Sequence, residues 1–133
     1  MYEVGVTAYF EAAHRLRGDF GPAANLHGHT YKVVVAARGP SLRQDGTLCD
    51  LGRLQSRVAE LAASLHYRNL DEVDELAGVN TTAEALARYF FDRLAEHLAG
   101  ELATSLEVRV WESPVAYAGY EGALTGGRDS SSE

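Results

Sequence analysis

The sequence contains little cysteine, little lysine and no long apolar run, and each scarcity narrows the possible functions. Cys49 is the only cysteine, so no internal disulfide can form and nothing points to an oxidising compartment. Lys32 is the only lysine and the formal net charge is -7, which repels nucleic acid and anionic membranes, so we expect neither partner. No apolar stretch is long enough to span a bilayer and the first residues lack a signal-peptide pattern, so we expect a cytoplasmic protein.

The length and the apolar content fit one domain with a hydrophobic core. The chain has 133 residues, of which 46% are hydrophobic, and this length leaves little room for a second domain. We expect the domain to cover residues 1–124. Residues 125–133 are mostly glycine, serine and charged residues, a composition that predicts a disordered tail.

The apolar periodicity predicts the order strand, strand, helix, helix, strand, strand. Period-two alternation indicates strands over residues 1–13, 30–37, 106–111 and 115–120. Helical periodicity follows Asp50, a candidate N-cap, and again follows a capping box formed by Thr81 and Glu84. This order predicts an α+β fold with a four-stranded antiparallel sheet and two helices on one face. The two open edges of such a sheet need protection, and pairing with other subunits is one solution, so we expect an oligomer.

Three histidines lie where a metal site can form. His27 and His29 are two residues apart on an extended segment, so both side chains point to the same face of the strand. His14 continues the apolar row of the first strand. Zinc accepts imidazole nitrogen, and three protein ligands leave a fourth position for water or substrate. We favour a metal site over two hydrogen-bonded core histidines with a third at a strand end, although iron or copper would also accept these ligands.

Glu112 shares the parity of Leu106, Val108 and Val110, the apolar row of its strand. A carboxylate on a buried face is costly unless it is paired. A ligand with two adjacent N–H donors, such as the edge of a pterin or guanine, would satisfy both of its oxygens. The alternative is that the strand ends at Trp111 and Glu112 turns into solvent, and the sequence alone favours neither.

At this point the motifs identify a family. The segments Phe10 to His14 (FEAAH) and Leu26 to Tyr31 (LHGHTY) resemble the 6-pyruvoyltetrahydropterin synthase and 6-carboxytetrahydropterin synthase family. Residues 50–54 are similar to its D-[FL]-x-x-L helix start, residues 80–84 to its N-P-T-x-E segment, and residues 111–113 to its late strand with an E-[ST] ending. The resemblance is collinear from Glu3 to Gly122, which makes it specific.

The resemblance implies the tunnelling (T-) fold, with subunits that close a barrel as trimers and stack as a homohexamer with active sites between subunits. It implies that His14, His27 and His29 bind zinc, that Glu112 anchors the pterin and that Thr82 lies beside the substrate. Family members act on 7,8-dihydroneopterin triphosphate or close relatives, which implies a pterin-like substrate here.

The catalytic pattern departs from the family at two places. The usual base is a cysteine four residues before the first histidine of HGH, where this chain has Ala23, and its loop also lacks the glutamate that some aldolase-like members carry. In an alignment without gaps, His66 and Tyr67 replace the Asp–His pair of the family's L-D-H-x-x-L segment. In an alignment shifted by one residue, His66 would instead occupy the position of the family's histidine. Both alignments break the pair.

Three hypotheses follow. The first is a zinc-dependent lyase acting on a pterin, with His66 and Tyr67 as proton donors and acceptors and with weak or absent 6-pyruvoyltetrahydropterin synthase activity. The second is a non-catalytic module of the same fold that binds a pterin or purine. The third is a zinc-stabilised structural oligomer without a small ligand. We place the first slightly ahead of the second.

Overall fold

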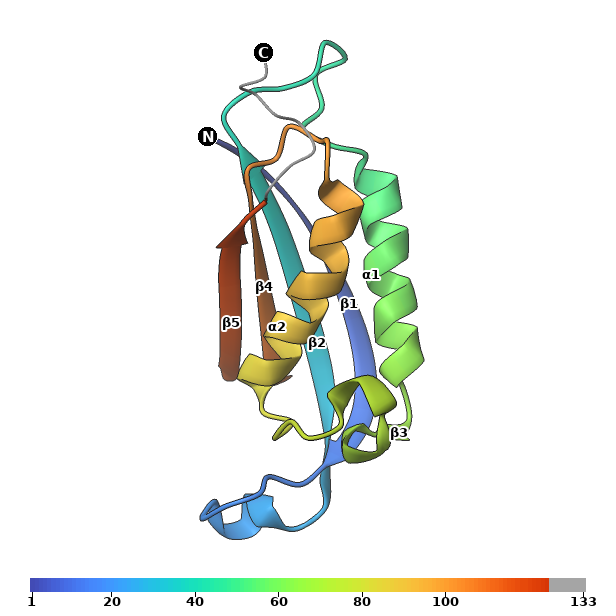
Figure 1. Ribbon diagram of the computed structural model, residues 1–133, viewed down its shortest axis with the longest axis vertical. Helices are drawn as coiled ribbons and strands as arrows, with labels where there is room; N and C mark the ends of the chain where they lie inside the picture. The colour runs from blue at the N-terminus through green and yellow to red at the C-terminus, as the bar shows by residue number, and fades with distance from the viewer. Residues whose placement is uncertain (125–133) are drawn as a thin grey trace.

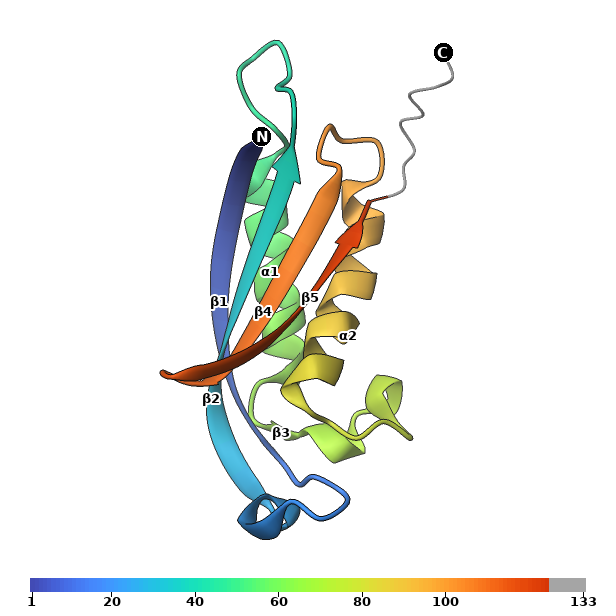
Figure 2. The same cartoon turned by 90° about the vertical axis from the view of Figure 1, so that its left-hand side faces the viewer.

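The computed structural model describes residues 1–124 as one twisted sheet with two helices packed against one of its faces (Figures 1 and 2). The strands are β1 (Tyr2–His14), β2 (His27–Gly39), β3 (Arg68–Asn69), β4 (Ser105–Ser113) and β5 (Ala116–Ala123). Their order in the sheet is β3-β1-β2-β4-β5. The α+β fold and the helices on one face are confirmed, and the expected tail at residues 125–133 lies outside the described residues.

The prediction of four strands was wrong by one. β3 adds a two-residue parallel pairing to β1, with Ala12 opposite Arg68 and Ala13 opposite Asn69. A strand this short has no periodicity that a sequence could reveal. The other pairings are antiparallel, as expected.

β1 and β2 form the longest pairing of the sheet, and it continues past the ends of both helices (Figure 1). The register runs from Tyr2 opposite Gly39 to His14 opposite His27. β2 therefore begins at His27, three residues earlier than the predicted strand. This extension brings all three histidines into the paired part of the sheet.

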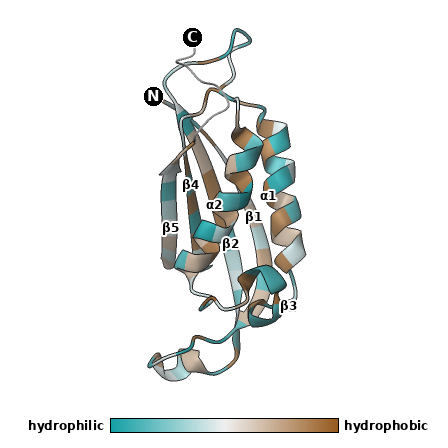
Figure 3. Ribbon diagram, in the orientation of Figure 1, coloured by the Kyte–Doolittle hydropathy of each residue, from teal (hydrophilic) through white to brown (hydrophobic). Residues whose placement is uncertain are grey.

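The helices are α1 (Leu51–Leu65) and α2 (Ala83–Ala95), and their apolar sides face the sheet (Figure 3). Asp50 caps α1 as predicted, because its carboxylate accepts a hydrogen bond from the Arg53 amide at 3.1 Å. The predicted capping box at Thr81 was wrong: the N-cap of α2 is Thr82, whose hydroxyl accepts from the Ala85 amide at 3.1 Å.

The remaining short elements are 3-10 turns: η1 (Gly21–Ala24), η2 (Leu70–Glu72), η3 (Asp74–Leu76) and η4 (Glu96–Leu98). η2 and η3 connect β3 to α2 at the end of the molecule where β1 ends and β2 begins (Figure 1). Within residues 1–124, no helix is long and apolar enough to cross a membrane.

The core between the sheet and the helices reaches almost to the histidines. Phe10 stacks on Tyr31 with ring centroids 4.8 Å apart and lies 6.1 Å from the ring of Phe90 on α2. All three rings are fully buried or nearly so. Because closely packed aromatic rings resist displacement, they form a rigid floor on which the end of the β1–β2 pair rests.

Candidate metal and pterin site

His14, His27 and His29 lie together at the end of the β1–β2 pair. The strand register brings these side chains together. His14 is opposite His27, and His29 is opposite Ala12, two residues before His14 on the same face. Their ring centroids are 4.6 Å (His14–His27), 5.1 Å (His14–His29) and 4.8 Å (His27–His29) apart. One ring nitrogen from each residue lies within 4.8 Å of the other two. The predicted cluster therefore exists in the fold.

Backbone carbonyls orient two of these imidazoles. The Nδ1 of His14 lies 2.8 Å from the Thr81 carbonyl, and the Nδ1 of His27 lies 2.7 Å from the Asn25 carbonyl. A carbonyl can only accept a hydrogen bond, so Nδ1 carries the proton in both rings and the lone pair lies on Nε2. This is the arrangement that metal-ligating histidines commonly show.

Burial also favours the neutral form of His14, which is only 1% exposed. Loss of solvation lowers the pKa of His14, and the nearby rings of His27 and His29 lower it further, although the hydrogen bond to the Thr81 carbonyl opposes them. A neutral imidazole is the form that binds a metal ion. His14 is therefore ready to act as a ligand without first losing a proton at neutral pH.

The donor set fits a tetrahedral metal ion after a small adjustment. Zinc–nitrogen bonds of about 2.0–2.1 Å place the donor atoms of a tetrahedral site about 3.4 Å apart. The three nitrogens lie within 4.8 Å of one another, so modest side-chain rotations bring them to that spacing. Three imidazoles suit zinc and other transition metals and do not suit magnesium or calcium, which prefer oxygen ligands.

Glu112 lies on a β-bulge of β4, next to the last pairs of the sheet. The register of β4 with β5 shifts between Trp111 and Ser113, so Glu112 is the extra residue. β4 continues through Ser113, and the side chain of Glu112 is half-buried rather than turned fully into solvent. Its charge contributes to the raised pKa of Tyr31, whose main cause is burial of the phenol. The antiparallel register pairs Trp111 with Lys32, so Glu112 and Tyr31 lie next to this pair on neighbouring strands.

Tyr31 contacts two of the three histidines. Its hydroxyl is 3.4 Å from the Nε2 of His14, and its ring is 5.2 Å from that of His29. Tyr31 is fully buried, so its side chain is held in place beneath the histidines and has no contact with solvent. From the sequence, Tyr31 was recognised only as part of an apolar row, although it shares its strand face with His27 and His29.

Thr82, the expected substrate neighbour, is half-buried at the N-cap of α2, where its hydroxyl is engaged with the Ala85 amide. The adjacent residue, Thr81, is fully buried and contacts His14 directly. Asp71 in η2 accepts a hydrogen bond from the Thr81 hydroxyl at 2.9 Å. Neither Thr81 nor Asp71 was recognised from the sequence as part of the site.

His66 and Tyr67 pair with the outer edge of β1 through Glu11. The Nδ1 of His66 accepts a hydrogen bond from the Glu11 amide at 3.0 Å, and the Tyr67 amide donates to the Glu11 carbonyl at 2.6 Å. The two rings stack with centroids 3.9 Å apart. Tyr67 has a positive φ of 61°, which is rare for a bulky residue and is a form of local strain often found near functional sites.

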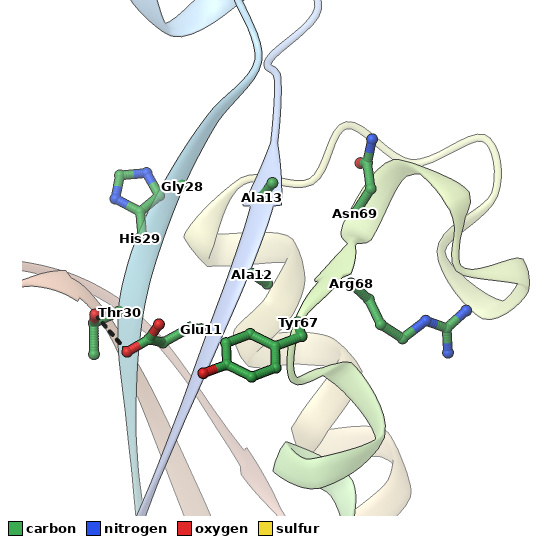
Figure 4. Close-up of a pocket in the computed structure, with 9 residues that line it drawn as sticks. All are labelled: Glu11, Ala12, Ala13, Gly28, His29, Thr30, Tyr67, Arg68 and Asn69. Atoms are coloured by element: carbon green, nitrogen blue, oxygen red, sulfur yellow. Dashed lines mark hydrogen bonds between the residues drawn. The ribbon is translucent and has the colours of Figure 1, made fainter.

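Tyr67 also borders an open cavity of about 470 Å³. Its walls include Glu11, His29, Thr30, Arg68 and Asn69 (Figure 4). The carboxylate of Glu11 points towards the Thr30 hydroxyl, 3.5 Å away. His66 does not line this cavity. Of the two predicted proton-transfer residues, Tyr67 is thus the one exposed to a space that a ligand could enter.

The family's usual cysteine has no counterpart near the histidines. Ala23 is half-buried in η1, where its carbonyl accepts from the Leu16 amide at 2.9 Å. Cys49 is buried beside the N-cap of α1, at the opposite end of that helix from His66. Burial raises the pKa of the Cys49 thiol, so it is a poor base as well as a distant one.

Known proteins are similar to this chain over nearly all of its described length. The family described as 6-pyruvoyl tetrahydropterin synthase matches residues 3–123. A 6-carboxy-5,6,7,8-tetrahydropterin synthase of Haemophilus influenzae is 28% identical over 91% of this chain and 99% of its own length. A 6-pyruvoyl tetrahydrobiopterin synthase of Poecilia reticulata is 35% identical over 85% of each chain.

The fold similarity is equally extensive. The solved structure of the Caenorhabditis elegans 6-pyruvoyl tetrahydropterin synthase superposes with a TM-score of 0.77 and 26% identity, covering 91% of this chain and 95% of that one. The chain shares the T-fold of this structure. The chain therefore belongs to the 6-pyruvoyl tetrahydropterin synthase family of pterin-processing enzymes.

Proposed function

We propose that this protein is a zinc-dependent lyase that acts on 7,8-dihydroneopterin triphosphate or a related pterin. The observation that carries the proposal is the set of three converging imidazoles, two of which donate their Nδ1 protons to backbone carbonyls. Histidines that only stabilise a core through hydrogen bonds do not require three ring nitrogens so close together. His14, His27 and His29 would hold the ion, which would supply Lewis acidity towards substrate oxygens.

Glu112 would bind the pyrimidine edge of the pterin. Its two carboxylate oxygens can accept two adjacent N–H donors, and such charge-assisted pairs are about twice as strong as neutral ones. The bulge at Glu112 supports this role, because bulges commonly redirect a side chain beside an active site. Half-burial limits competition from water while leaving room for a ligand to approach.

Tyr67 and His66 would move protons in place of the family's cysteine and Asp–His pair. Tyr67 borders the cavity, and its phenolic hydroxyl can both donate and accept a proton. His66 accepts from the Glu11 amide through Nδ1, so its Nε2 carries the exchangeable proton. A general acid or base contributes about 10²–10⁴-fold to a rate, so replacement of the usual groups predicts weak 6-pyruvoyltetrahydropterin synthase activity.

A homohexamer of two stacked trimers, with sites between subunits, would complete the active protein. The sheet supports self-association, because β5 is an open edge and β1 is paired by β3 only at Ala12 and Ala13. Ring closure through such edges satisfies their backbone groups.

A second function is favoured by Ala23. Alanine cannot transfer a proton, so the protein would then bind a pterin or purine through Glu112 without converting it. Incubation of the zinc-loaded protein with dihydroneopterin triphosphate and other pterins, followed by product analysis and binding measurements, separates the two functions. Turnover that falls about 10²–10⁴-fold in Tyr67→Phe, but not in Tyr2→Phe at the far end of β1, supports the lyase. Tight binding without any product supports the carrier.

A further inference from the structure

Thr81 offers two oxygen atoms to the same ring nitrogen of His14. Its carbonyl lies 2.8 Å and its hydroxyl oxygen 3.3 Å from Nδ1. Thr81 is fully buried, so water does not compete for these contacts. The position of this one residue therefore controls the orientation of the His14 ring.

Asp71 in turn controls Thr81. One carboxylate oxygen accepts the Thr81 hydroxyl proton at 2.9 Å, and the other accepts from the amide of Arg15, the residue after His14, also at 2.9 Å. The Asp71 carboxylate thus binds both the backbone next to His14 and Thr81, which His14 contacts. Asn69 stabilises Asp71, because its side-chain oxygen accepts from the Asp71 amide at 3.0 Å.

The hydrogen bonds that join His14, Thr81 and Asp71 all run from donor to acceptor in the same direction, towards Asp71. The Thr81 hydroxyl gives its proton to Asp71, so its oxygen is left to accept from His14. Both oxygens of Thr81 then require a proton on Nδ1, so the lone pair of His14 lies on Nε2, where the Tyr31 hydroxyl is 3.4 Å away. The negative charge of the Asp71 carboxylate also makes the His14 imidazole a stronger base towards a cation.

We propose that Asp71 is a positioning residue for the metal site, acting through Thr81 to fix the ring orientation and proton position of His14. The inference rests on the proposed function, since it assumes that the three histidines bind an ion. Partners that hold a ligand in this way typically contribute about 10–100-fold to metal affinity. Asp71 lies outside the ligand set and outside the motifs that the family resemblance used.

Two pairs of variants test the proposal. Asp71→Asn removes the charge and replaces one acceptor with a donor, while Asp74→Asn makes the same charge change at an exposed residue whose side chain has no hydrogen bond or ion pair within residues 1–124. Thr81→Val removes the hydroxyl at nearly constant shape, while Thr81→Ser keeps it. Zinc affinity of each full-length protein is measured by competition with a chromophoric chelator, alongside the melting temperature of the metal-free form.

We expect Asp71→Asn to weaken zinc binding about 10–100-fold and Thr81→Val to weaken it severalfold, with Asp74→Asn and Thr81→Ser close to the wild type. A role in folding alone would lower the melting temperature without changing the affinity of the folded protein, and that result overturns the proposal. Equal affinities of Asp71→Asn and Asp74→Asn also overturn it. A wild-type protein that binds no zinc overturns the proposed function as well, whereas normal wild-type binding with an unaffected Asp71→Asn refutes this inference only.

Discussion

Replacement of Glu112 by glutamine tests the ligand anchor with little change in shape. The carboxylate offers two acceptor oxygens, whereas the amide offers one acceptor and one donor. The donor would face an N–H group of the pterin, so one hydrogen bond is lost and two donors oppose each other. The substitution therefore removes the recognition chemistry and leaves the size of the side chain almost unchanged.

The expected loss of pterin affinity in Glu112→Gln depends on the half-buried position of this side chain. A hydrogen bond to a charged group contributes about 1.5–3 kcal/mol, and partial solvent exposure reduces this towards the lower end. Because about 1.4 kcal/mol corresponds to a factor of ten in affinity, we expect Glu112→Gln to raise the Kd for 7,8-dihydroneopterin by about tenfold to fiftyfold.

Two measurements are available for this prediction. Isothermal titration gives the Kd directly, and the fluorescence of Trp111, the only tryptophan of the chain and the neighbour of Glu112, reports binding independently. Glu121→Gln on β5 is the control, because it makes the same chemical change at an exposed residue. A Kd for Glu112→Gln within about threefold of the wild-type value, or an equal loss in Glu121→Gln, would refute the anchor.

Two further predictions concern stability. Partial burial raises the pKa of Glu107, but hydrogen bonds from Arg38 at 2.7 Å and Arg109 at 3.1 Å outweigh it and lower the pKa overall. A lowered pKa means that Glu107 stabilises the fold above its unfolded pKa and that this contribution is lost as the pH falls through the folded pKa. Urea unfolding between about pH 5 and about pH 3 should therefore show a shallower loss of stability in Glu107→Gln than in the wild type, and equal slopes would contradict the ion-pair argument. Gly39→Ala places a Cβ 2.7 Å from the Leu102 carbonyl oxygen, and we expect it to cost about 1–3 kcal/mol of unfolding free energy. The same substitution at the exposed Gly52 in α1 should not destabilise, and equal losses at both positions would exclude a steric cause.

The parts of the fold with strong periodicity could be predicted from the sequence. Alternation along β1 and β2 assigned His14, His27 and His29 to one face, because period two is a direct consequence of the pleat. Asp50 was recognised as an N-cap because it directly precedes the apolar periodicity of α1, and its carboxylate accepts from the Arg53 amide. These assignments depend on local geometry alone.

The parts that depend on contacts distant in sequence could not be predicted. Thr81 and Thr82 have the same capping chemistry, and the contact of Thr81 with His14, 67 residues away in sequence, leaves Thr82 to cap α2. Asp71 lies in an acidic, irregular stretch and is exposed in the fold, so only its contact with Thr81 distinguishes it from other surface charges. The pairing of Arg68 with Ala12 is likewise visible only in three dimensions.

The proposed function depends on a transition-metal ion bound by His14, His27 and His29, and the metal content of the protein shows whether they bind one. Protein purified without chelator is examined by elemental mass spectrometry, together with His27→Asn and with His97→Asn, an exposed histidine outside the cluster. We predict about one zinc ion per chain in the wild type and in His97→Asn, and a large loss of zinc in His27→Asn. A wild-type protein without stoichiometric transition metal, or a His27→Asn variant that keeps it, would contradict the account.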